Sequence, residues 1–447
     1  MVILGKRQRS SGSGILNLYQ REVGVLSPRN FSHRVRASED FVLRLGIDRK
    51  LNKHNGCVNT VSLNENGNIL VSGSDDQMVI LWDWEVGTVR TSFHSGHKDN
   101  VFQARFMPCT AHHQTIVTSA ADGEVRLAQL REGGQVTTEL LAEHDDAVHK
   151  VAFELQNPHV LYSGGEDGLV QHFDLRSKNS TKLFICRSFR RRPTYTSFVN
   201  LMAISIDPRN PNYLAVAGAD DYARVYDIRK YKWDGSTNYG LPCENFCPAH
   251  LIDHSEGISG LCFSDSSELL VSYMNEYIYL FPKDQGLGSN PVSLLSDSDS
   301  EGKSNSVLST SNASLGIKLY KGHCNRKTVK DVNFFGPYCD YVVSGSDCGR
   351  IFIWRKKDGI LLRAMKGDRH VVNCTVSHPH TTMLASSGIE KDVKIWVPNT
   401  THPFQPVNLD EGYDVEDLEN DDDSYDTDFS DSDDGTEEDV FADGVTF

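Results

Sequence analysis

The chain has 447 residues, of which 38% are hydrophobic and 24% are charged. This composition is ordinary for a soluble globular protein and excludes a wholly disordered chain. The net charge of −16 arises at the C-terminal end, because 18 of the 61 acidic residues lie in residues 410–447, which contain no Lys or Arg. The other 43 acidic residues nearly balance the 45 basic ones, so the body of the chain carries +2. A near-neutral body with an acidic end gives no basis for direct nucleic-acid binding.

The beginning of the chain has no export or membrane signal. Its sequence, MVILGKRQRSSGSG, contains an apolar stretch that is too short for the core of a signal peptide. No segment approaches the roughly 18 apolar residues of a membrane helix. The ten cysteines are scattered along the chain, as expected for reduced thiols. We therefore expect a protein of the nucleus and cytoplasm without a membrane partner, and KRQR at residues 6–9 is consistent with nuclear import.

Residues 1–38 precede any repeat and are expected to form a partly disordered arm. From residue 54 onward one unit recurs seven times: a loop, a strand, a turn, a second strand, an acidic turn and a third strand that usually ends in an aromatic residue. The copies begin at His54, His97, His144, Asn200, His254, His323 and His370. Consecutive loop histidines lie 43 or 47 residues apart in three cases, near the period of a WD40 repeat. The sequence thus predicts an all-β fold, a seven-bladed WD40 β-propeller with disordered termini.

The first copy matches the hydrogen-bonded tetrad that stiffens a WD40 blade. A loop histidine, a strand serine, a turn aspartate and a strand tryptophan make up this tetrad, and here they are His54, Ser72, Asp76 and Trp82. Later copies lack some members. Ala128 replaces the tryptophan in the second copy, Val216 the serine in the fourth and Cys348 the aspartate in the sixth.

A propeller closes when a strand near the N-terminus completes the last blade, since an unpaired edge is a liability. The segment Glu39–Ile47 (EDFVLRLGI) is the predicted closing strand, which gives a propeller over residues 39–398. Three insertions are expected between blades, at Ser177–Phe198, Lys230–Asp253 and Gln285–Ser314. The third is rich in Ser, Asp and Asn and is predicted to be disordered over residues 285–314, as is the acidic tail at residues 399–447.

The sequence carries little that indicates catalysis. It contains no Gly-x-Ser-x-Gly, phosphate-binding Gly-Lys-Ser/Thr or His-Glu-x-x-His motif, so we expect a non-catalytic protein without a cofactor. One compact run, Cys243, Cys247, His250 and His254, offers the ligand types that zinc prefers. Its spacing matches no standard zinc finger and His254 has a blade position, so free thiols and no metal are expected.

Four hydroxyl residues have an acidic residue three positions later, the pattern that acidophilic kinases favour. These candidate phosphorylation sites are Ser296, Ser298, Ser430 and Thr436. A phosphate would add about −1.5 to −2 charges at each. Simple solvation of disordered segments explains the same composition and stays open as the alternative.

Two neighbouring copies end in the same way. Residues 161–176 (LYSGGEDGLVQHFDLR) and 214–229 (LAVAGADDYARVYDIR) both close on aromatic-Asp-x-Arg, and the other five copies lack this arginine. Residues two apart at a strand end point to the same side, so Asp174 can brace the guanidinium of Arg176, and Asp227 that of Arg229. One such pair alone is explained as an ion pair that ends a blade. Two on adjacent blades favour a docking site, because clustered arginines mark interfaces.

This ending resembles the DWD box, or WDxR motif, of the WD40 substrate receptors of cullin-4 RING ubiquitin ligases, with Phe173 and Tyr226 in place of the usual tryptophan. Further segments, among them REVGVLSPRNF, FCPAHLID and HPHTTMLASSGIEKDVKIW, extend the resemblance over residues 15–400 to the subfamily of the eighth DDB-and-cullin-4-associated factor. A related group carries tetratricopeptide repeats, and no helical 34-residue repeat is found here.

The resemblance implies a substrate-recognition subunit that presents unknown target proteins to the ligase. It implies docking on the adaptor, damage-specific DNA-binding protein 1, through Asp174, Arg176, Asp227 and Arg229, with a helical contact added by Ile15–Phe31. A ligase-independent WD40 scaffold, associated with chromatin, would use the same propeller and stays open as the alternative.

Overall fold

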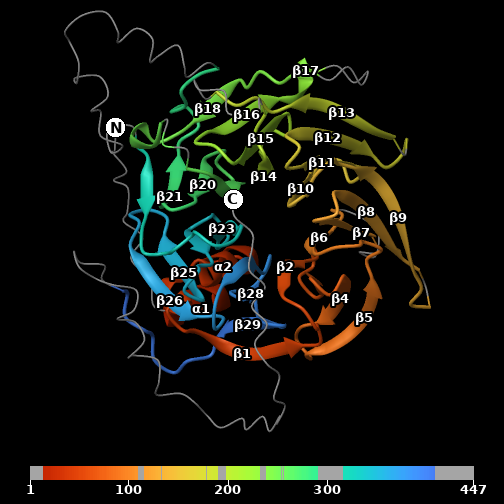
Figure 1. Ribbon diagram of the computed structural model, residues 1–447. Helices are drawn as coiled ribbons and strands as arrows, with labels where there is room; N and C mark the ends of the chain where they lie inside the picture. Colours follow the sequence, from red (N-terminus) through yellow and green to blue (C-terminus); the bar gives the residue numbers. More distant parts are fainter. Residues whose placement is uncertain are drawn as a thin grey trace, which may run out of the picture. The chain divides into compact units, whose positions relative to one another are not determined.

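The computed structural model describes residues 14–108, 115–131, 133–177, 179–189, 198–231, 238–252, 254, 256–289 and 316–407. Strands dominate these residues and form seven sheets, six with four strands and one with five. The sheets are arranged as blades around a common centre (Figure 1). The predicted all-β, seven-bladed propeller is therefore confirmed. Three short helices, α1 (Gly14–Glu22), α2 (Pro28–Arg36) and α3 (Glu39–Val42), precede the first strand.

Each blade is an antiparallel meander whose strands follow one another in chain order from the centre outward. The exceptions are the fifth strand of blade three and the outer strand of blade seven. Blades one to four are built as follows. Blade one contains β2 (Val58–Leu63), β3 (Leu70–Ser74), β4 (Met78–Asp83) and β5 (Thr88–His94). Blade two contains β6 (Val101–Phe106), β7 (Thr115–Ala120), β8 (Glu124–Leu130) and β9 (Val136–Glu143). Blade three contains β10 (Lys150–Phe153), β11 (Val160–Gly164), β12 (Leu169–Asp174) and β13 (Asn179–Ile185), and blade four contains β14 (Leu201–Ile206), β15 (Tyr213–Gly218), β16 (Ala223–Asp227) and β18 (Glu244–Phe246).

The remaining three blades complete the ring. Blade five contains β19 (Ile258–Phe263), β20 (Leu269–Tyr273), β21 (Ile278–Phe281) and β22 (Lys318–Tyr320). Blade six contains β23 (Val332–Phe335), β24 (Tyr341–Ser344), β25 (Arg350–Arg355) and β26 (Leu361–Lys366). Blade seven contains β27 (Val372–Ser377), β28 (Leu384–Gly388), β29 (Asp392–Pro398) and, as its outer strand, β1 (Leu45–Asn52).

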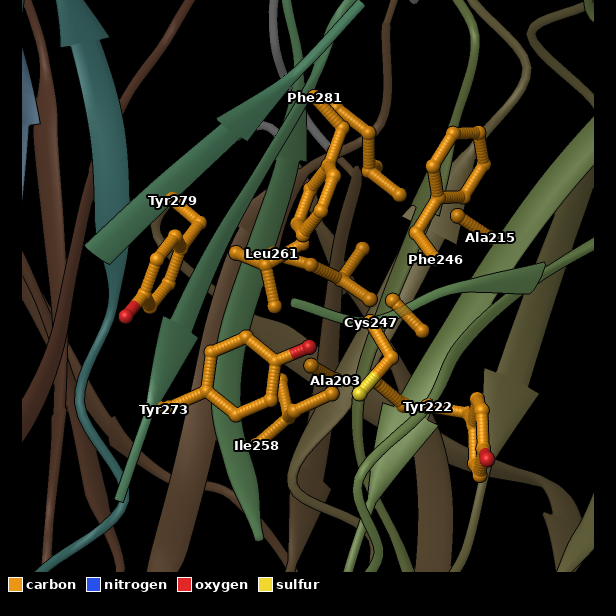
Figure 2. Close-up of a cluster of buried hydrophobic side chains, with 14 of the residues drawn as sticks. Ala203, Ala215, Tyr222, Phe246, Cys247, Ile258, Leu261, Tyr273, Tyr279 and Phe281 are labelled. Carbon is orange, nitrogen blue, oxygen red and sulfur yellow. The ribbon is translucent and has the colours of Figure 1, made fainter. Parts of the chain in front are cut away.

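The hydrophobic core lies between blades. Second strands such as β3, β11 and β28 are buried at every residue, because both of their faces are covered by neighbouring blades, whereas the outer strand β9 alternates between half-buried and exposed residues. Figure 2 shows the contact between blades four and five, where Phe246 and Phe281 pack with their ring centroids 5.6 Å apart. Cys247 and Tyr273 fill the same cluster and are also buried. Interdigitation of this kind fixes each blade against the next.

The ring closes by pairing β1 with β29, from Leu45 opposite Pro398 to Asn52 opposite Asp392. The predicted closing strand is thus correctly placed, but its bounds were wrong. Residues 39–42 form α3 because the side chain of Glu39 accepts hydrogen bonds from Arg355, with the closest nitrogen and oxygen 2.6 Å apart, and Val42 is fully buried on the ring. The strand begins only at Leu45 and continues to Asn52.

Two expected insertions carry blade strands instead. The segment Ser177–Phe198 contains β13, the outer strand of blade three, and Lys230–Asp253 contains β18, the outer strand of blade four. The second segment also supplies β17 (Asn238–Tyr239), which pairs in parallel with β13 as a fifth strand of blade three. Of the third insertion, only residues 285–289 are described.

Residues 399–407, which the sequence assigned to the disordered tail, pack against the ring. The backbone N–H of Phe404 donates to the carbonyl of Leu43 (2.9 Å), and that of Val407 donates to Leu361 (3.0 Å). The guanidinium carbon of Arg363 lies 3.8 Å from the centroid of the Phe404 ring, a cation–π contact. The sequence alone could not show this ordering, because the partners belong to distant segments. Residues 408–447 lie outside the described part of the chain.

The described helices are all too short or too polar to cross a membrane. The nine cysteines in the described residues are free, as expected for reduced thiols, and Cys109 lies outside them.

Acidification should destabilise the ring. Burial lowers the pKa of His172, His323 and His378 to about 4, whereas an unfolded histidine titrates near 6.5. Between pH ~4 and ~6.5 the unfolded chain therefore binds more protons than the folded one, so the free energy of unfolding falls as the pH drops through this window. Urea unfolding followed by tryptophan fluorescence at pH 7 and pH 5 measures the effect.

His378 gives the matched variant for this test. Its Nε2 donates to the carbonyl of Gly67 (3.1 Å), and its Nδ1 accepts from the backbone N–H groups of His380 and Thr381 (2.9 Å each), so the site is built for a neutral ring. A His378→Gln protein should lose less stability than the wild type between pH 7 and pH 5. If the stability of this variant depended on pH as strongly as that of the wild type, His378 would not contribute to the acid destabilisation.

Candidate docking face

The ring has two faces that the strand order distinguishes. The loops that enter the first strand of each blade and the turns that follow the second strand lie on one face, which we call the histidine face. The turns that follow the first and third strands lie on the other, which we call the arginine face because it carries Arg176 and Arg229. Backbone hydrogen bonds join the two kinds of turn there, for example from Leu175 to His159 and from Ile228 to Asn212 (2.9 Å each).

The structure brings the four tetrad residues of blade one together on the histidine-face side. His54 Nδ1 donates to the carboxylate of Asp76 (3.0 Å), and His54 Nε2 accepts from the Ser72 hydroxyl (2.8 Å). Trp82 Nε1 donates to the same hydroxyl (2.8 Å). Burial lowers the pKa of His54, so the ring is neutral at pH 7. This series of hydrogen bonds links the loop, the turn and two strands of the blade, which is a structural role.

Blades two and three repeat the linkage with three members each. His97 joins Thr118 (2.9 Å) to Asp122 (3.0 Å), and His144 joins Ser163 (2.8 Å) to Asp167 (3.1 Å). Within the described ranges, His97, Asp122 and Glu124 are also the one group of side chains close enough to hold a metal. His97 and Asp122 are hydrogen-bonded to each other and Glu124 pairs with Arg126 (2.5 Å), so this group is already used.

Three expected blade histidines do not enter a tetrad. His323 of blade six is buried, but neither of its ring nitrogens has a hydrogen-bond partner. His254 and His370 are exposed, because other groups join the loop to the turn in their blades. In blade seven the buried carboxylate of Asp368 accepts from the backbone N–H of His370 and of Glu390 (2.9 Å each). In blade five the backbone N–H of Met274 donates to the carbonyl of Gly257 (2.7 Å).

On the arginine face, Asp174 ends β12 and Arg176 follows in the turn to β13. Arg176 Nε donates to Asp174 Oδ1 (2.9 Å) and Nη2 donates to Oδ2 (2.7 Å), a two-pronged ion pair. The backbone N–H of Arg176 also donates to Asp174 Oδ1 (2.9 Å), which fixes the turn. These hydrogen bonds from Arg176 lower the pKa of Asp174 to about 2, so the carboxylate stays charged at neutral pH.

The next blade repeats this geometry. Asp227 ends β16 and caps the short 3₁₀ helix η2 (Ile228–Lys230), and Arg229 Nε and Nη2 donate to its two oxygens at 2.8 and 2.7 Å. The Arg229 side chain lowers the pKa of Asp227. The arginine side chains are nevertheless 59% and 58% exposed in the two pairs. Each guanidinium uses two of its five N–H donors on the aspartate and presents the rest to solvent.

The N-terminal arm packs on the same face, because it contacts Tyr338 and Tyr341, which lie in and directly after the turn that follows the first strand of blade six. Instead of one helical segment over Ile15–Phe31, it contains α1 and α2, because Gly24 turns the chain at φ +75° and Ser27 caps α2 ahead of Pro28. Arg34 Nη1 donates to Asn17 Oδ1 (3.1 Å) and to Gln20 Oε1 (3.0 Å), which holds the two helices together.

Contacts with blade six anchor this arm. The ring centroids of His33 and Tyr338 lie 5.3 Å apart, and the Tyr341 hydroxyl donates to the carbonyl of Ala37 (3.0 Å). Five large apolar side chains of the arm stay between 47% and 75% exposed, and we call them the arm patch. They are Leu16, Leu18, Tyr19, Val23 and Val25. This patch was not predicted from the sequence, although apolar residues recur along the segment.

The four candidate zinc ligands near residue 250 do not come together around one point. Cys243 Sγ donates to the carbonyl of Val225 (3.1 Å), and the thiol of Cys247 is buried in the core between blades four and five. His250, in the 3₁₀ helix η3 (Ala249–Leu251), lies with Nε2 3.1 Å from the Tyr279 hydroxyl, and His254 is exposed. The candidate phosphorylation sites Ser296, Ser298, Ser430 and Thr436 lie outside the described residues.

Comparison with known proteins identifies the repeat. The family pattern described as "WD domain, G-beta repeat" matches residues 47–83, 316–355 and 359–397. These three segments of the propeller match the WD40 repeat.

Curated relatives match in part. DDB1- and CUL4-associated factor 6 of Homo sapiens and that of Mus musculus are each 33% identical over 279 residues, which cover 59% of this chain and 31% of the relative. The chain thus spans about a third of the length of these two proteins. WD and tetratricopeptide repeats protein 1 of Homo sapiens is 23% identical over 633 residues, covering 90% of this chain and 91% of that protein. These similarities support a WD40 protein like the DDB1- and CUL4-associated factors.

Removing the exposed arginines should leave the fold intact. Arg176→Ala and Arg229→Ala break ion pairs whose arginines face water, and such pairs contribute little to stability. We expect each variant to change the Tm by less than about 2 °C in a thermal melt. His54→Ala is the contrast, since it leaves buried tetrad partners unsatisfied and should lower the Tm by more than either arginine variant. An equal decrease of the Tm in all three variants would contradict this difference between the two faces.

Proposed function

We propose that the chain is the substrate-recognition subunit of a cullin-4 RING ubiquitin ligase and docks on the adaptor, damage-specific DNA-binding protein 1, through its arginine face. The observation that carries this proposal is the pair of identically built Asp–Arg turns on blades three and four. Each aspartate holds its guanidinium by two hydrogen bonds while more than half of the arginine side chain stays exposed. A guanidinium fixed in this way loses little conformational entropy when it binds a carbonyl or carboxylate of a partner.

The arm supplies a second contact to the same partner. Its apolar patch is unusual for a solvent-exposed helix pair, and it lies on the face that carries the arginines. Two separate contacts on one rigid body act together, because the first raises the effective concentration for the second. Burial of the arm patch would supply the hydrophobic part of the binding free energy, and the arginines the directional part.

In this proposal the chain performs no chemistry. Its role is to hold a target protein near the ubiquitin-loaded enzyme, which raises the effective concentration of the reacting groups. The targets and the surface that binds them are not specified by the arginine face. We place the protein in the nucleus and cytoplasm.

Within this group we infer the subfamily of the eighth associated factor. The motif segments that resemble this subfamily extend over residues 15–400. The long alignment with WD and tetratricopeptide repeats protein 1 reaches only 23% identity, and this sequence has no helical 34-residue repeat.

A ligase-independent WD40 scaffold is the alternative. One observation favours it: each Asp–Arg pair is already satisfied within the chain, so the motif also serves to end its blade. The experiment below separates the two functions.

The double variant Arg176→Ala plus Arg229→Ala should lose co-purification with the adaptor and cullin-4 from cells. Truncation of interface arginines that act as hot spots weakens binding by about tenfold or more each. Quantitative mass spectrometry of affinity-purified complexes measures the recovery.

Arg90→Ala is the matched control. Arg90 is exposed and pairs with Asp83 (2.7 Å), which ends the third strand of blade one on the same face but outside an Asp-x-Arg turn. This control should keep full recovery. If the double variant folds and still retains the adaptor as the wild type does, the scaffold function is favoured instead.

Charges placed in the arm patch should weaken the same complex. Leu16→Asp and Tyr19→Asp put a carboxylate on surface that the proposed interface buries, while both positions tolerate it in the free protein because they are 48% and 60% exposed. We expect recovery of the adaptor to fall several-fold with no change in the Tm.

Leu140→Asp, at a 45% exposed position on the outer strand of blade two, is the control for a surface charge elsewhere. Equal recovery with the arm variants and with this control would show that the arm takes no part in docking.

A further inference from the structure

A central cavity of ≈ 430 Å³ runs between the first strands of all seven blades, and a second cavity of ≈ 200 Å³ opens beside it. The second cavity lies on the arginine face, beside the ends of the first strands of blades seven, one, two and three. Arg105 on β6 lines both cavities. The Arg105 side chain therefore lies where the two cavities meet.

The charge of Arg105 has no close counter-ion. Lys150, the other cation of the central cavity, pairs across the ring with Asp331 of blade six (2.7 Å). Within the described part of the chain, no carboxylate lies within 4 Å of the Arg105 guanidinium, which instead sits 5.0 Å from the centroid of the Phe153 ring. Asp207, a further acid of the cavity wall, is held by the Ser267 hydroxyl (3.0 Å). Arg105 is thus a cation that this part of the protein leaves open to an incoming anion.

Burial makes the lack of a close counter-ion energetically costly for Arg105. It lowers the pKa of Arg105, and the charge of Asp331 only partly opposes the effect. A cation taken from water gains most from a charge-assisted hydrogen bond to a carboxylate, and arginine forms it with two N–H groups at once. The site therefore favours a ligand that carries a carboxylate.

The second cavity adds an apolar requirement. Its walls include Phe106, Met107, Phe153 and Val376, and Leu155 extends them to the surface with 56% of its area exposed. Its volume is below the roughly 300–1,000 Å³ of sites that enclose a free small molecule. It suits one or two side chains of a polypeptide.

We propose that Arg105 and this cavity bind a short segment of a partner protein in which an acidic side chain adjoins large apolar ones. The carboxylate pairs with the guanidinium, and an apolar side chain enters the cavity against Phe153 and Leu155. The proposal requires neither the adaptor nor the ligase. It assigns to the centre of the arginine face a recognition site with a defined chemistry.

The test uses the full chain and a fluorescein-labelled peptide, Gly-Ser-Leu-Asp-Phe-Ser-Gly, in a fluorescence-anisotropy titration. Saturable binding is expected. A peptide with Asn in place of Asp, and one with Ser in place of both Leu and Phe, should each bind about tenfold more weakly or worse, since the first loses a charge-assisted bond and the second loses apolar burial.

Variants of the protein locate the site. Arg105→Gln should weaken binding of the probe by about tenfold or more, with Arg105→Lys between it and the wild type because lysine keeps the charge but not the two-pronged geometry. Leu155→Glu should also weaken binding, and Arg90→Gln, an exposed arginine elsewhere on this face, should bind as the wild type does. Far-UV circular dichroism and the Tm verify that each variant folds.

Three outcomes overturn the proposal: no saturable binding of the probe to the wild type, equal binding of the Asn peptide, or wild-type affinity in folded Arg105→Gln protein. If Arg105→Gln does not fold, Leu155→Glu decides, because its side chain is exposed, and wild-type affinity in that variant overturns the proposal equally. Adaptor recovery by the Arg176→Ala plus Arg229→Ala protein is measured separately, so the failure of one proposal does not obscure the other.

Discussion

The pairing of β1 with β29 is the constraint on which the arrangement of this molecule depends. Six blades take all their strands from the chain that follows residue 52, but the seventh is completed from the N-terminal side. Because β1 is antiparallel to β29 and begins opposite Pro398, it starts at the end of blade seven where the third strand finishes. That end is the arginine face. The chain ahead of β1 and the chain after β29 must therefore both emerge on this face.

This topology explains why the arm lies on the same face as Arg176 and Arg229. The arm is joined to the closing strand through α3, which is separated from that strand by two residues and whose Glu39 is held by Arg355. Residues 399–407 leave β29 on the same side and pack on Leu43 and Arg363. Ring closure thus gathers the two ends of the propeller beside blades six and seven, while the Asp–Arg turns occupy blades three and four.

The two faces use similar polar residues in different ways, since one face buries them and the other exposes them. On the histidine face, the tetrad side chains of blades one to three are buried and hydrogen-bonded to one another, so they hold loops to strands. On the arginine face, the aspartates are partly covered and the guanidinium groups are exposed, which leaves donors available to a partner. Burial, rather than residue type, separates a stabilising ion pair from one that is free to bind.

The repeat pattern was sufficient to predict the fold, the number of blades and the place of the closing strand, because these follow from local alternation and from the need to remove an edge. It failed for three histidines. Asp368 joins the loop to the turn in place of His370, a backbone hydrogen bond does so in place of His254, and the ring of His323 is buried without a hydrogen bond. No local sequence pattern distinguishes these cases. It also failed for β13 and β18, whose short polar-leaning sequences read as insertions. The Lys150–Asp331 pair that leaves Arg105 open joins blades three and six across the ring, so it depends on the closed fold and not on any neighbourhood in the sequence.

Three features follow one another around the arginine face: the arm over blades six and seven, the cavity between blades seven and three, and the Asp–Arg turns of blades three and four. Around the ring in one direction the cavity lies between the arm and the arginines, and in the other direction blade five separates them. In the proposed interactions each feature would supply a different component of recognition: apolar area from the arm, a positive charge at Arg105 and directed, exposed donors at the turns. Since the three lie on one rigid ring, their spacing is set by the blades themselves, and a partner whose surface does not match all three loses the cooperative part of the binding free energy.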